Sequence, residues 1–328
     1  RTRLLRDVAF CAMLQRYSLR MGAEMQSLDP KQTRAFLAAT TAGTVRGAAE
    51  ALGVEPSTIS RAITGLETTL ATRLIERGRR GVQLTEAGAL LRDHLRRESS
   101  EMEALQSRFD ALKGMARGTV RVAVGEGFVG DLVGGALPGF AATHPGLTYA
   151  LEQGSTDAVR HSVMTDQAHL GLAYDVAPDR ALKFLARHPQ PLMMLARPGS
   201  RFADLSAPLS MAALANLPAA VLTGGYGVGS VLARAEARAG HRLHAVVETG
   251  SIAVLLAFAR SGMGVTVLPR FAAMADIAAG GLVVREIAEP EFQTGEAALI
   301  ARNGRELPRA AQSMAAHLAR RMAAFGGQ

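Results

Sequence analysis

The chain of 328 residues contains no tryptophan, one cysteine and no long run of uncharged apolar residues. Since Cys11 has no second cysteine to pair with, an internal disulfide framework is excluded, and a reducing compartment, the cytoplasm, is expected. The most apolar stretch, Ile252 to Leu268, contains Arg260 and two glycines. It is therefore excluded as a transmembrane helix, and we expect no membrane partner. His241 and His244 are the only close histidine pair, and no cysteine or carboxylate completes a metal-binding set, so no metal and no cofactor are expected.

A length of 328 residues is enough for two or three domains. The formal net charge is +8, and the excess of basic residues is denser in the first third of the chain. Such a charge is compatible with binding to DNA phosphates, although a solvated basic surface is the more common explanation. Residues 1–24 are rich in arginine and poor in acids, which we interpret as an N-terminal extension for which disorder is one explanation. The first domain is expected to begin near Met25.

Apolar residues over Val45 to Leu66 predict two short helices joined by a tight turn. The apolar side chains recur at helical spacing on both sides of the turn: Val45, Ala48, Ala49 and Leu52 before it, and Ile59, Ile63 and Leu66 after it. Thr44 is placed to cap the first helix, and Gly53 is placed to end it in the left-handed conformation. Pro56 falls where the first position of the second helix belongs. Such a pair, preceded by a helix predicted over Pro30 to Ala42, is a helix-turn-helix.

The second helix carries short hydroxyl groups and one guanidinium group outside its apolar face. These side chains lack bulk and acidic charge, which suits a helix that lies in a DNA major groove. We therefore expect contacts with DNA from Ser57, Thr58, Ser60, Arg61 and Thr64. An ordinary helical hairpin would show the same pattern, so this stretch alone leaves both interpretations open.

A basic turn follows the helix pair. Short strands are predicted at residues 74–75 and 82–84, joined by a turn over residues 78–81. A hairpin at this place is a wing that could lie along the DNA backbone, and it favours DNA binding over the alternative of a solvated basic turn. The expected DNA contacts are completed by Thr44 and Arg46 at the first helix and by Arg77, Arg79 and Arg80 in the wing.

A long helix is predicted after Thr85, which is placed to cap it. Apolar residues follow in it at alternating spacings of four and three, with one polar exception, and this heptad pattern requires a partner helix. The members are Leu91, Leu95, Glu98, Met102, Leu105, Phe109 and Leu112. We favour dimerisation through this helix, which would place two recognition helices roughly 34 Å apart, one turn of DNA. The alternative is an amphipathic helix that packs on its own domain.

From Thr119 onward the pattern alternates between strands and helices, which predicts parallel sheets covered by helices on both faces. Strands are predicted at residues 119–124, 147–152, 170–173, 191–196, 219–222, 245–249, 265–268 and 297–301. Helices are predicted at residues 130–144, 155–165, 228–239, 251–261 and 308–324. The two series separate near residue 190, so we expect two subdomains, about 119–190 with 304–328, and about 191–303. A ligand cleft is expected between them, outside the carboxyl ends of the strands.

Three loops on the expected cleft end a strand and begin a helix: residues 125–128, 223–230 and 249–251. Free backbone N–H groups at such helix starts bind small anions, carboxylates above all. The expected effector contacts are Glu126, Gly127, Phe128, Thr223, Gly225, Tyr226, Ser230, Thr249 and Ser251. For any single loop the alternative is that its hydroxyl group only caps its own helix.

A competing pattern is G-E-G-F-V-G, residues 125–130, which has the spacing of a dinucleotide-binding loop between a strand and a helix. Glu152 lies at the end of the next strand, where a ribose-binding acid would be. The alternative function is therefore an NAD(P)-dependent oxidoreductase that uses Gly125, Gly127, Gly130 and Glu152. It is disfavoured because the loop follows a DNA-binding candidate and because the second series begins after only three strands. No acid, base and nucleophile combine elsewhere, so we expect no enzyme.

Residues 25 to about 320 resemble the LysR-type transcriptional regulators of bacteria. The resemblance is densest in L-D-P-K-Q-T-R-A-F, G-T-V-R-G-A-A-E-A-L-G-V, S-T-I-S-R-A-I-T-G-L-E, T-R-L-I-E-R and Q-L-T-E-A-G, which follow the family's order and spacing. The segments P-G-F-A-A-T-H-P-G-L, G-L-A-Y and S-G-M-G-V-T-V-L-P are similar to landmarks of the family's effector domain.

The resemblance implies a fold with an all-α N-terminal part and a C-terminal α/β part. The winged helix-turn-helix would span residues 25–84, a dimerising linker helix and hinge 85–118, and an effector domain 119–328 with the two-subdomain shape of a type II periplasmic binding protein. It also implies homotetramers that bind double-stranded promoter DNA under the control of a small-molecule effector. Glu55 and Pro56 depart from the Ser-Gln that many members carry, so a base contact by that Gln is lost. Glu126 replaces the usual Ser or Thr of the cleft, which puts an organic-acid effector in doubt.

Overall fold

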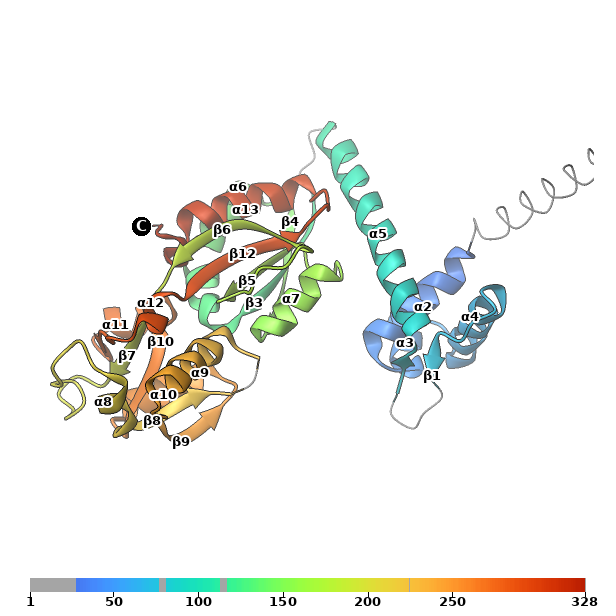
Figure 1. Cartoon of the computed structure of the whole chain (residues 1–328). Coiled ribbons are helices and arrows are strands. Elements are labelled where there is room, and N and C mark those ends of the chain that lie inside the picture. Colours follow the sequence, from blue (N-terminus) through green and yellow to red (C-terminus); the bar gives the residue numbers. More distant parts are fainter. Residues whose placement is uncertain (1–27, 77–80, 113–116, 224, 328) are drawn as a thin grey trace, which may run out of the picture. The chain divides into compact units, whose positions relative to one another are not determined.

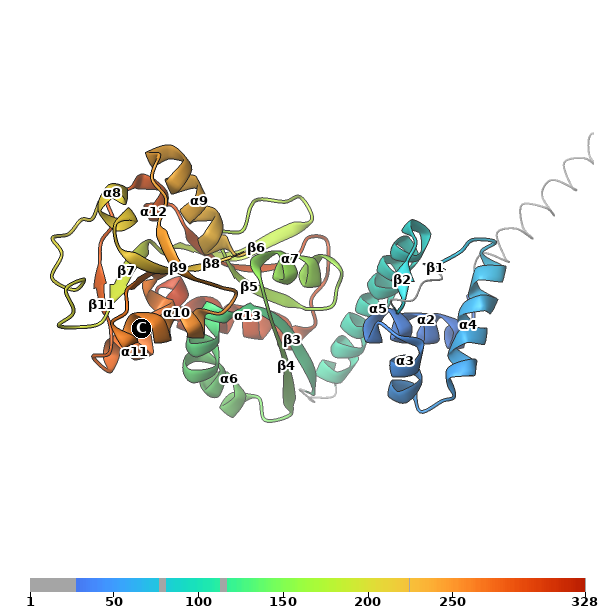
Figure 2. The same cartoon turned by 90° about the horizontal axis from the view of Figure 1, so that it is seen from below.

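The structure is a computed structural model that describes residues 28–76, 81–112, 117–223 and 225–327 (Figures 1 and 2). Contacts divide the chain into two compact units, residues 1–98 and residues 99–328. The division falls within one long helix, α5 (Glu86–Leu112). Across the described ranges, no helix is both long enough and apolar enough to cross a membrane.

The first unit is built on three short helices, as the apolar spacing predicted: α2 (Pro30–Ala42), α3 (Val45–Leu52) and α4 (Pro56–Thr69). Their apolar faces meet in one core, in which Phe36, Ile59 and Leu66 are fully buried. The predicted caps are confirmed, because the Thr44 hydroxyl accepts a 3.0 Å hydrogen bond from the Gly47 N–H and Gly53 ends α3 with a φ of 65°. The capping residues therefore fix where the first helix of the helix-turn-helix begins and ends.

A two-stranded antiparallel ladder follows the helices. It consists of β1 (Ile75–Glu76) and β2 (Gln83–Leu84), with Ile75 opposite Leu84. The predicted wing thus has its two strands, while residues 77–80 between them lie outside the described part of the chain. The Val82 N–H donates a 2.8 Å hydrogen bond to the Gly43 carbonyl, which anchors the ladder beside the start of α3.

Helix α5 begins as predicted, with the Thr85 hydroxyl accepting a 3.0 Å hydrogen bond from the Gly88 N–H. The prediction of one continuous apolar seam from Leu91 to Leu112 is wrong. Leu95 is only 8% exposed because it completes the core of the first unit, where a small three-helix bundle needs a further apolar face. Met102, Leu105 and Phe109 are 64%, 39% and 48% exposed. Of the predicted seam, the part that is open to a partner helix is therefore confined to the later turns of α5.

The second unit contains two five-stranded sheets. The first sheet has the order β4 (Leu147–Gly154), β3 (Gly118–Gly125), β5 (Leu170–Tyr174), β12 (Glu296–Arg302) and β6 (Leu182–Pro189). One of its faces is covered by α6 (Leu137–Thr143) and α13 (Arg309–Arg321), and the other by α7 (Thr156–Met164) (Figure 1). This sheet and its helices are called the first lobe.

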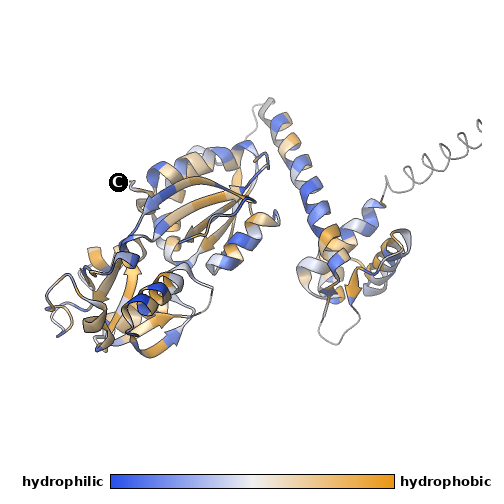
Figure 3. Ribbon diagram, in the orientation of Figure 1, coloured by the Kyte–Doolittle hydropathy of each residue, from blue (hydrophilic) through white to orange (hydrophobic). Residues whose placement is uncertain are grey.

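The second sheet has the order β11 (Val283–Arg285), β7 (Leu192–Ala196), β10 (Val265–Pro269), β8 (Pro218–Leu222) and β9 (His244–Thr249). It forms the second lobe with its helices: α8 (Met211–Ala215), α9 (Gly227–Ala239), α10 (Ile252–Ser261), α11 (Met274–Ala278) and α12 (Pro290–Gln293). The central strands of both sheets are largely hydrophobic, whereas polar residues interrupt the edge strands β4, β6 and β9 (Figure 3). The central strands therefore supply the core of each lobe.

The prediction of parallel sheets is wrong, because both sheets are mixed. β3 is parallel to β4 and β5, whereas β12 is antiparallel to β5 and β6, and β7 is antiparallel to β10 and β11. The antiparallel strands are those through which the chain crosses between the lobes. Since β12 belongs to the first sheet, the return crossing precedes Glu296 and does not lie at residue 303. The helix predicted at residues 130–144 is divided into a π-helix, η2 (Gly130–Ala136), and α6.

Gln190 lies at the first crossing and Gly295 at the second. The Gln190 N–H donates to the Gly295 carbonyl at 2.8 Å, and the Tyr174 hydroxyl donates to the Gln190 carbonyl at 2.7 Å. The Gln190 side-chain amide donates to the carbonyls of Ala323 and Ala324 in η4 (Ala323–Phe325), at 3.2 and 2.9 Å. Burial raises the pKa of Tyr174, so its hydroxyl keeps the proton that it donates. The two crossings are therefore tied to each other and to the last turn of the chain.

Candidate functional site

The outer face of α4 presents the polar side chains that the sequence assigned to DNA. Ser57, Thr58, Ser60, Arg61 and Thr64 are all exposed, while the apolar residues between them are buried. The Arg61 Nε–H donates a 3.3 Å hydrogen bond to the Ser57 carbonyl, so the guanidinium lies along the helix toward its first turn. The result is an exposed helix face of short hydroxyl side chains with one cationic group.

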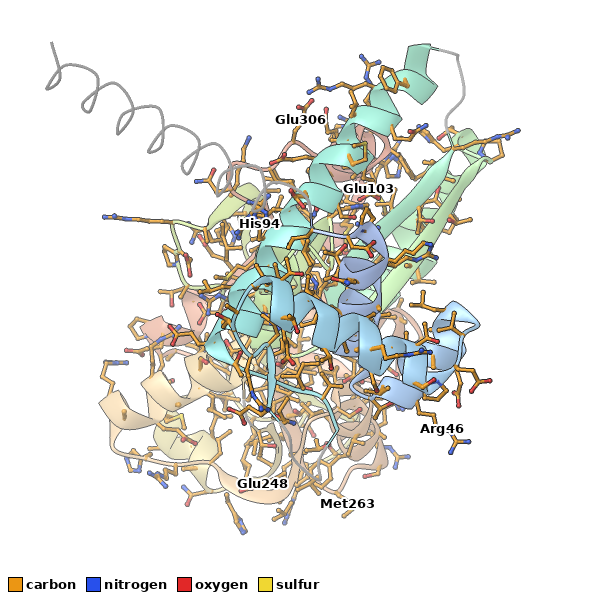
Figure 4. All side chains as sticks on the ribbon, turned by 90° about the vertical axis from the view of Figure 1, so that its right-hand side faces the viewer. Arg46, His94, Glu103, Glu248, Met263 and Glu306 are labelled. Atoms are coloured by element: carbon orange, nitrogen blue, oxygen red, sulfur yellow. The ribbon has the colours of Figure 1, made fainter. Side chains whose placement is uncertain are left out.

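Two further expected contacts lie at the start of α3. Thr44 is exposed, although its hydroxyl is used in capping. The Arg46 side chain is 86% exposed and projects from the unit, with its Nε atom 3.3 Å from Glu50 (Figure 4). Surface pairs of this kind contribute little, so Arg46 can exchange Glu50 for another anion. Arg77, Arg79 and Arg80, the expected wing contacts, lie outside the described residues.

The three loops predicted to line the effector cleft do meet between the two lobes. Glu126 in η1 (Glu126–Phe128) accepts hydrogen bonds from the Ser251 hydroxyl and from the first N–H groups of α10. The Tyr226 hydroxyl donates a 2.6 Å hydrogen bond to the Gly250 carbonyl, and the Thr223 N–H donates to the Thr249 carbonyl at 3.0 Å. These loops thus bond to one another.

The cleft beside Glu126 is narrow. The rings of Phe128 and Phe271 lie 4.7 Å apart between centroids, across the two lobes. A methyl group added at Gly127 would lie 3.1 Å from Ile252 and 3.3 Å from Ala272, so a side chain here would require one of these neighbours on the second lobe to shift. The cavity that remains measures about 30 Å³. It is too small for an organic ligand.

A larger cavity of about 430 Å³ lies at the start of α9, and Gly225 and Ser230 of the expected set line it. Its charged lining was missed by the sequence analysis: Arg160, Arg187 and Arg234 with Asp157, Asp175 and Glu296. Every arginine is paired, Arg187 with Glu296 at 2.7 Å and Arg234 with Asp175 at 2.9 Å, for example. Asp175 directly follows β5, a strand that was predicted, and its position is the one local signal of this cavity in the sequence. Arg187 gave no such signal because it lies on β6, a strand that was not predicted.

A second group of charges, also missed, joins α5 to the base of the first lobe. The Arg121 guanidinium donates two hydrogen bonds to Glu103, at 3.1 and 2.8 Å, and the nearly buried Arg305 lies between Glu103 and Asp166. The side chains of Arg108 and Glu306 pair further along the helix, and Figure 4 labels Glu103 and Glu306.

His169 is buried beside Glu103 and its tautomer follows from its partners. The backbone N–H of Arg121 donates to His169 Nδ1 at 3.2 Å, so the proton of the neutral ring lies on Nε2. This nitrogen donates to the Glu103 carboxylate at 3.2 Å and also lies 2.7 Å from Nη2 of Arg121. Burial lowers the pKa of His169, and the hydrogen bond to Glu103 opposes this only in part. Burial alone would raise the pKa of Glu103, but hydrogen bonds from His169 and Arg121 lower it to about 2. The cluster therefore holds a neutral imidazole and a charged carboxylate.

The dinucleotide alternative does not fit the loop that suggested it. A pyrophosphate needs free N–H groups and open space at the start of a helix. Here Glu126 inside the G-x-G-x-x-G loop is itself an anion bound to α10, and Gly127 is pressed against the second lobe. The loop continues into a π-helix rather than a regular α-helix.

Comparisons with known proteins agree with this geometry. Residues 30–89 match the family described as "Bacterial regulatory helix-turn-helix protein, lysR family", and residues 113–323 match the "LysR substrate binding domain". A probable hydrogen peroxide-inducible genes activator of Mycobacterium avium is 29% identical over 78% of this chain and 83% of its own length. An SDS degradation transcriptional activation protein of a Pseudomonas species is 32% identical, over 52% of this chain and 56% of its own.

Full-length OxyR from Pseudomonas aeruginosa has the same fold, with a TM-score of 0.69 at 19% identity over 90% of this chain and 95% of that one. The matched families and relatives are transcriptional regulators, which overturns the oxidoreductase alternative. The chain belongs to the LysR family of bacterial regulators, with a DNA-binding helix-turn-helix unit followed by a unit that binds an effector.

Proposed function

We propose that the chain reads promoter DNA with α4 in the major groove, and that a small molecule in the cleft between the two lobes alters this binding. The observation that carries the proposal is the division of α4 into a buried apolar face and an exposed face of hydroxyl groups with Arg61. Such a face can approach base edges closely, and a guanidinium donates two parallel hydrogen bonds to guanine. Thr44, Arg46 and the wing would contact the phosphates on either side.

The proposed assembly is a dimer formed through the later turns of α5, and a tetramer built from two dimers. Its support is the exposed apolar group Met102, Leu105 and Phe109 on the later turns of this long helix. Two recognition helices joined in this way would read two half-sites. We place the assembly in the cytoplasm, where a DNA-binding regulator of bacteria meets its promoters.

The proposed effector site is the cavity of about 430 Å³ at the start of α9. Its size suits a small metabolite, and its arginine and acid pairs can reorganise around a polar ligand. Because residues from both lobes line the cavity, Arg160 from the first and Ser230 from the second among them, a ligand there would be sensitive to their separation.

The test is the binding of the purified full chain to genomic fragments that it selects itself from sheared bacterial DNA. We expect a selected fragment to bind more tightly than a shuffled duplex of equal composition, with an affinity that falls steeply as salt is raised, because phosphate contacts release counterions. Equal affinity for the selected and shuffled duplexes would refute the proposed DNA recognition. Affinity that no metabolite from a cell extract changes would refute the proposed effector control.

A further inference from the structure

Glu126 reaches from the first lobe to a helix of the second. It follows β3, and its carboxylate accepts three hydrogen bonds: from the Ser251 hydroxyl at 2.9 Å, from the Ile252 N–H at 2.7 Å and from the Ala253 N–H at 2.9 Å. Ser251 precedes α10 and makes no capping hydrogen bond of its own. Glu126 therefore caps a helix to which it does not belong.

This position is an anion site by its physical chemistry. The first N–H groups of a helix have no partner within the helix, and the helix dipole places partial positive charge there. A carboxylate that accepts several N–H groups at such an end forms short, charge-assisted hydrogen bonds. The carboxylate of Glu126 occupies the place that a carboxylate ligand would take, and the remaining 30 Å³ are too small for a second carboxylate beside it.

Helix α9 also begins at the cleft, and its first N–H group likewise bonds to a residue of the first lobe. The Gly227 N–H at the start of α9 donates a 3.0 Å hydrogen bond to the Thr156 hydroxyl, and Thr156 belongs to the first lobe. The Asp157 N–H donates back to the Gly225 carbonyl at 3.3 Å. The starts of α9 and α10 are thus both occupied by groups of the first lobe, but of Thr156 and Glu126 only Glu126 brings a charge.

We propose that Glu126 is a built-in ligand, a tethered carboxylate that fills the anion site at α10 and holds the two lobes together. The inference rests on the proposed function, in which an effector binds between the two lobes. Simple carboxylates are then not effectors of this regulator, because their site is already taken. The effector instead enters the larger cavity, where the paired arginines and acids favour a polar molecule that needs no carboxylate at α10.

The test removes the carboxylate of Glu126 by mutation and supplies a free carboxylate, acetate, in its place. Glu126→Ala deletes the atoms that acetate supplies, so acetate is the probe, with acetamide and chloride as the neutral and ionic controls. Glu152→Ala, on exposed β4 of the same lobe, is the matched control variant. Calorimetric melting of the full chain is measured for the wild type and both variants with rising amounts of each solute.

We expect Glu126→Ala to melt at least about 3 °C below the wild type, and acetate but not acetamide or chloride to recover part of the difference. The wild type and Glu152→Ala should not respond specifically to acetate. An unchanged melting temperature in Glu126→Ala, or an acetate effect equal in all three proteins, would overturn the proposal. If Glu126→Ala does not fold, Glu126→Gln keeps the bulk and must still melt below the wild type; equal melting overturns the proposal.

The same preparations separate this inference from the proposed function. Promoter preference is measured on the wild type by the selection assay above. Missing acetate rescue with intact promoter preference would overturn the built-in ligand alone, whereas intact rescue without promoter preference would overturn the proposed DNA recognition alone.

Discussion

His169 Nε2 donates a 3.2 Å hydrogen bond to the carboxylate of Glu103, which joins the residue before β5 to helix α5. The pair lies within the second unit, 66 residues apart in the chain. Because the acceptor is charged and the donor is a buried neutral imidazole, the contact depends on pH in a way that can be worked out for each partner.

Acid should lower the stability of the second unit in two steps. The pKa of His169 is lowered in the folded chain, so its contribution to stability is complete above the ordinary histidine pKa of about 6.5 and falls as the pH drops below it. The pKa of Glu103 is lowered to about 2, so its contribution is complete above about 4.5 and is lost between there and about 2. Thermal unfolding of the wild type across this range should show both losses.

Glu103→Gln should remove the second step and destabilise the second unit at neutral pH by about 2 kcal/mol, the typical value of a hydrogen bond to a charged group. Glu101→Gln is the matched control, because Glu101 is exposed on the same helix. The expectation fails if both variants unfold at the same temperature, or if the acid limb of the Glu103→Gln profile matches that of the wild type.

Arg61→Ala should weaken binding to a selected promoter fragment by about 1–3 kcal/mol, and binding to random duplex by much less. The reason is that a base contact carries sequence information whereas a phosphate contact does not. Fluorescence anisotropy with both duplexes at one salt concentration gives the ratio. Arg34→Ala, exposed on α2, serves as the control for lost charge. An unchanged ratio for Arg61→Ala would count against a base contact.

Gly81→Ala and Gly53→Ala should separate the two destabilising effects of replacing glycine, backbone strain and steric overlap with a neighbour. Both positions have positive φ, 77° and 65°, so both variants pay about 1 kcal/mol of backbone strain. Only at Gly81 would the new methyl group meet backbone, 2.5 Å from the Gly43 carbonyl oxygen. We expect Gly81→Ala to lower the melting temperature of the first unit further than Gly53→Ala. Equal losses would show that the wing can move away from α3 without cost.

Met102→Glu with Phe109→Glu should convert a dimer into a monomer in sedimentation velocity, because the charges would lie on the only large apolar face of the later α5 turns that the structure describes. An increase of the dissociation constant of at least about 100-fold is expected, the equivalent of roughly 3 kcal/mol. Val254→Glu, exposed on α10, is the control. A double variant with the sedimentation coefficient of the wild type would contradict the proposed interface. Leu95 is unsuitable for this test because its loss would unfold the first unit.

Local signals predicted the first unit well. Helices α2 to α4 follow from apolar spacing, and their ends follow from Thr44, Gly53 and Pro56, because caps act within a few residues of the chain. The strand β6 escaped prediction because Lys183, Arg187 and His188 interrupt its apolar pattern. Its position depends on pairing with β12, more than 100 residues later.

The contrast between local signals and contacts distant in the sequence also explains which parts of the candidate site were predicted. The three loops of the cleft were found because a strand, glycines and a helix start are adjacent in the sequence. The role of Glu126 could not be found, since its partner Ser251 is 125 residues away and a carboxylate was expected only to repel ligands. The ion pairs of Glu103 with Arg121 and His169 were missed for the same reason, because nothing local marks a partner that folding brings from elsewhere.

The crossing at Gln190 limits how the lobes can move. Its backbone and side-chain groups are engaged by Gly295, Tyr174 and the η4 turn. If one lobe rotates against the other, the backbone dihedral angles that change must lie after Gln190 and before Gly295. The pivot is therefore on the side of the two crossings that faces the second lobe. The backbone N–H of Gln190 should accordingly be among the slowest in the unit to exchange with deuterium. Its exchange should remain slow while the cleft opens and closes.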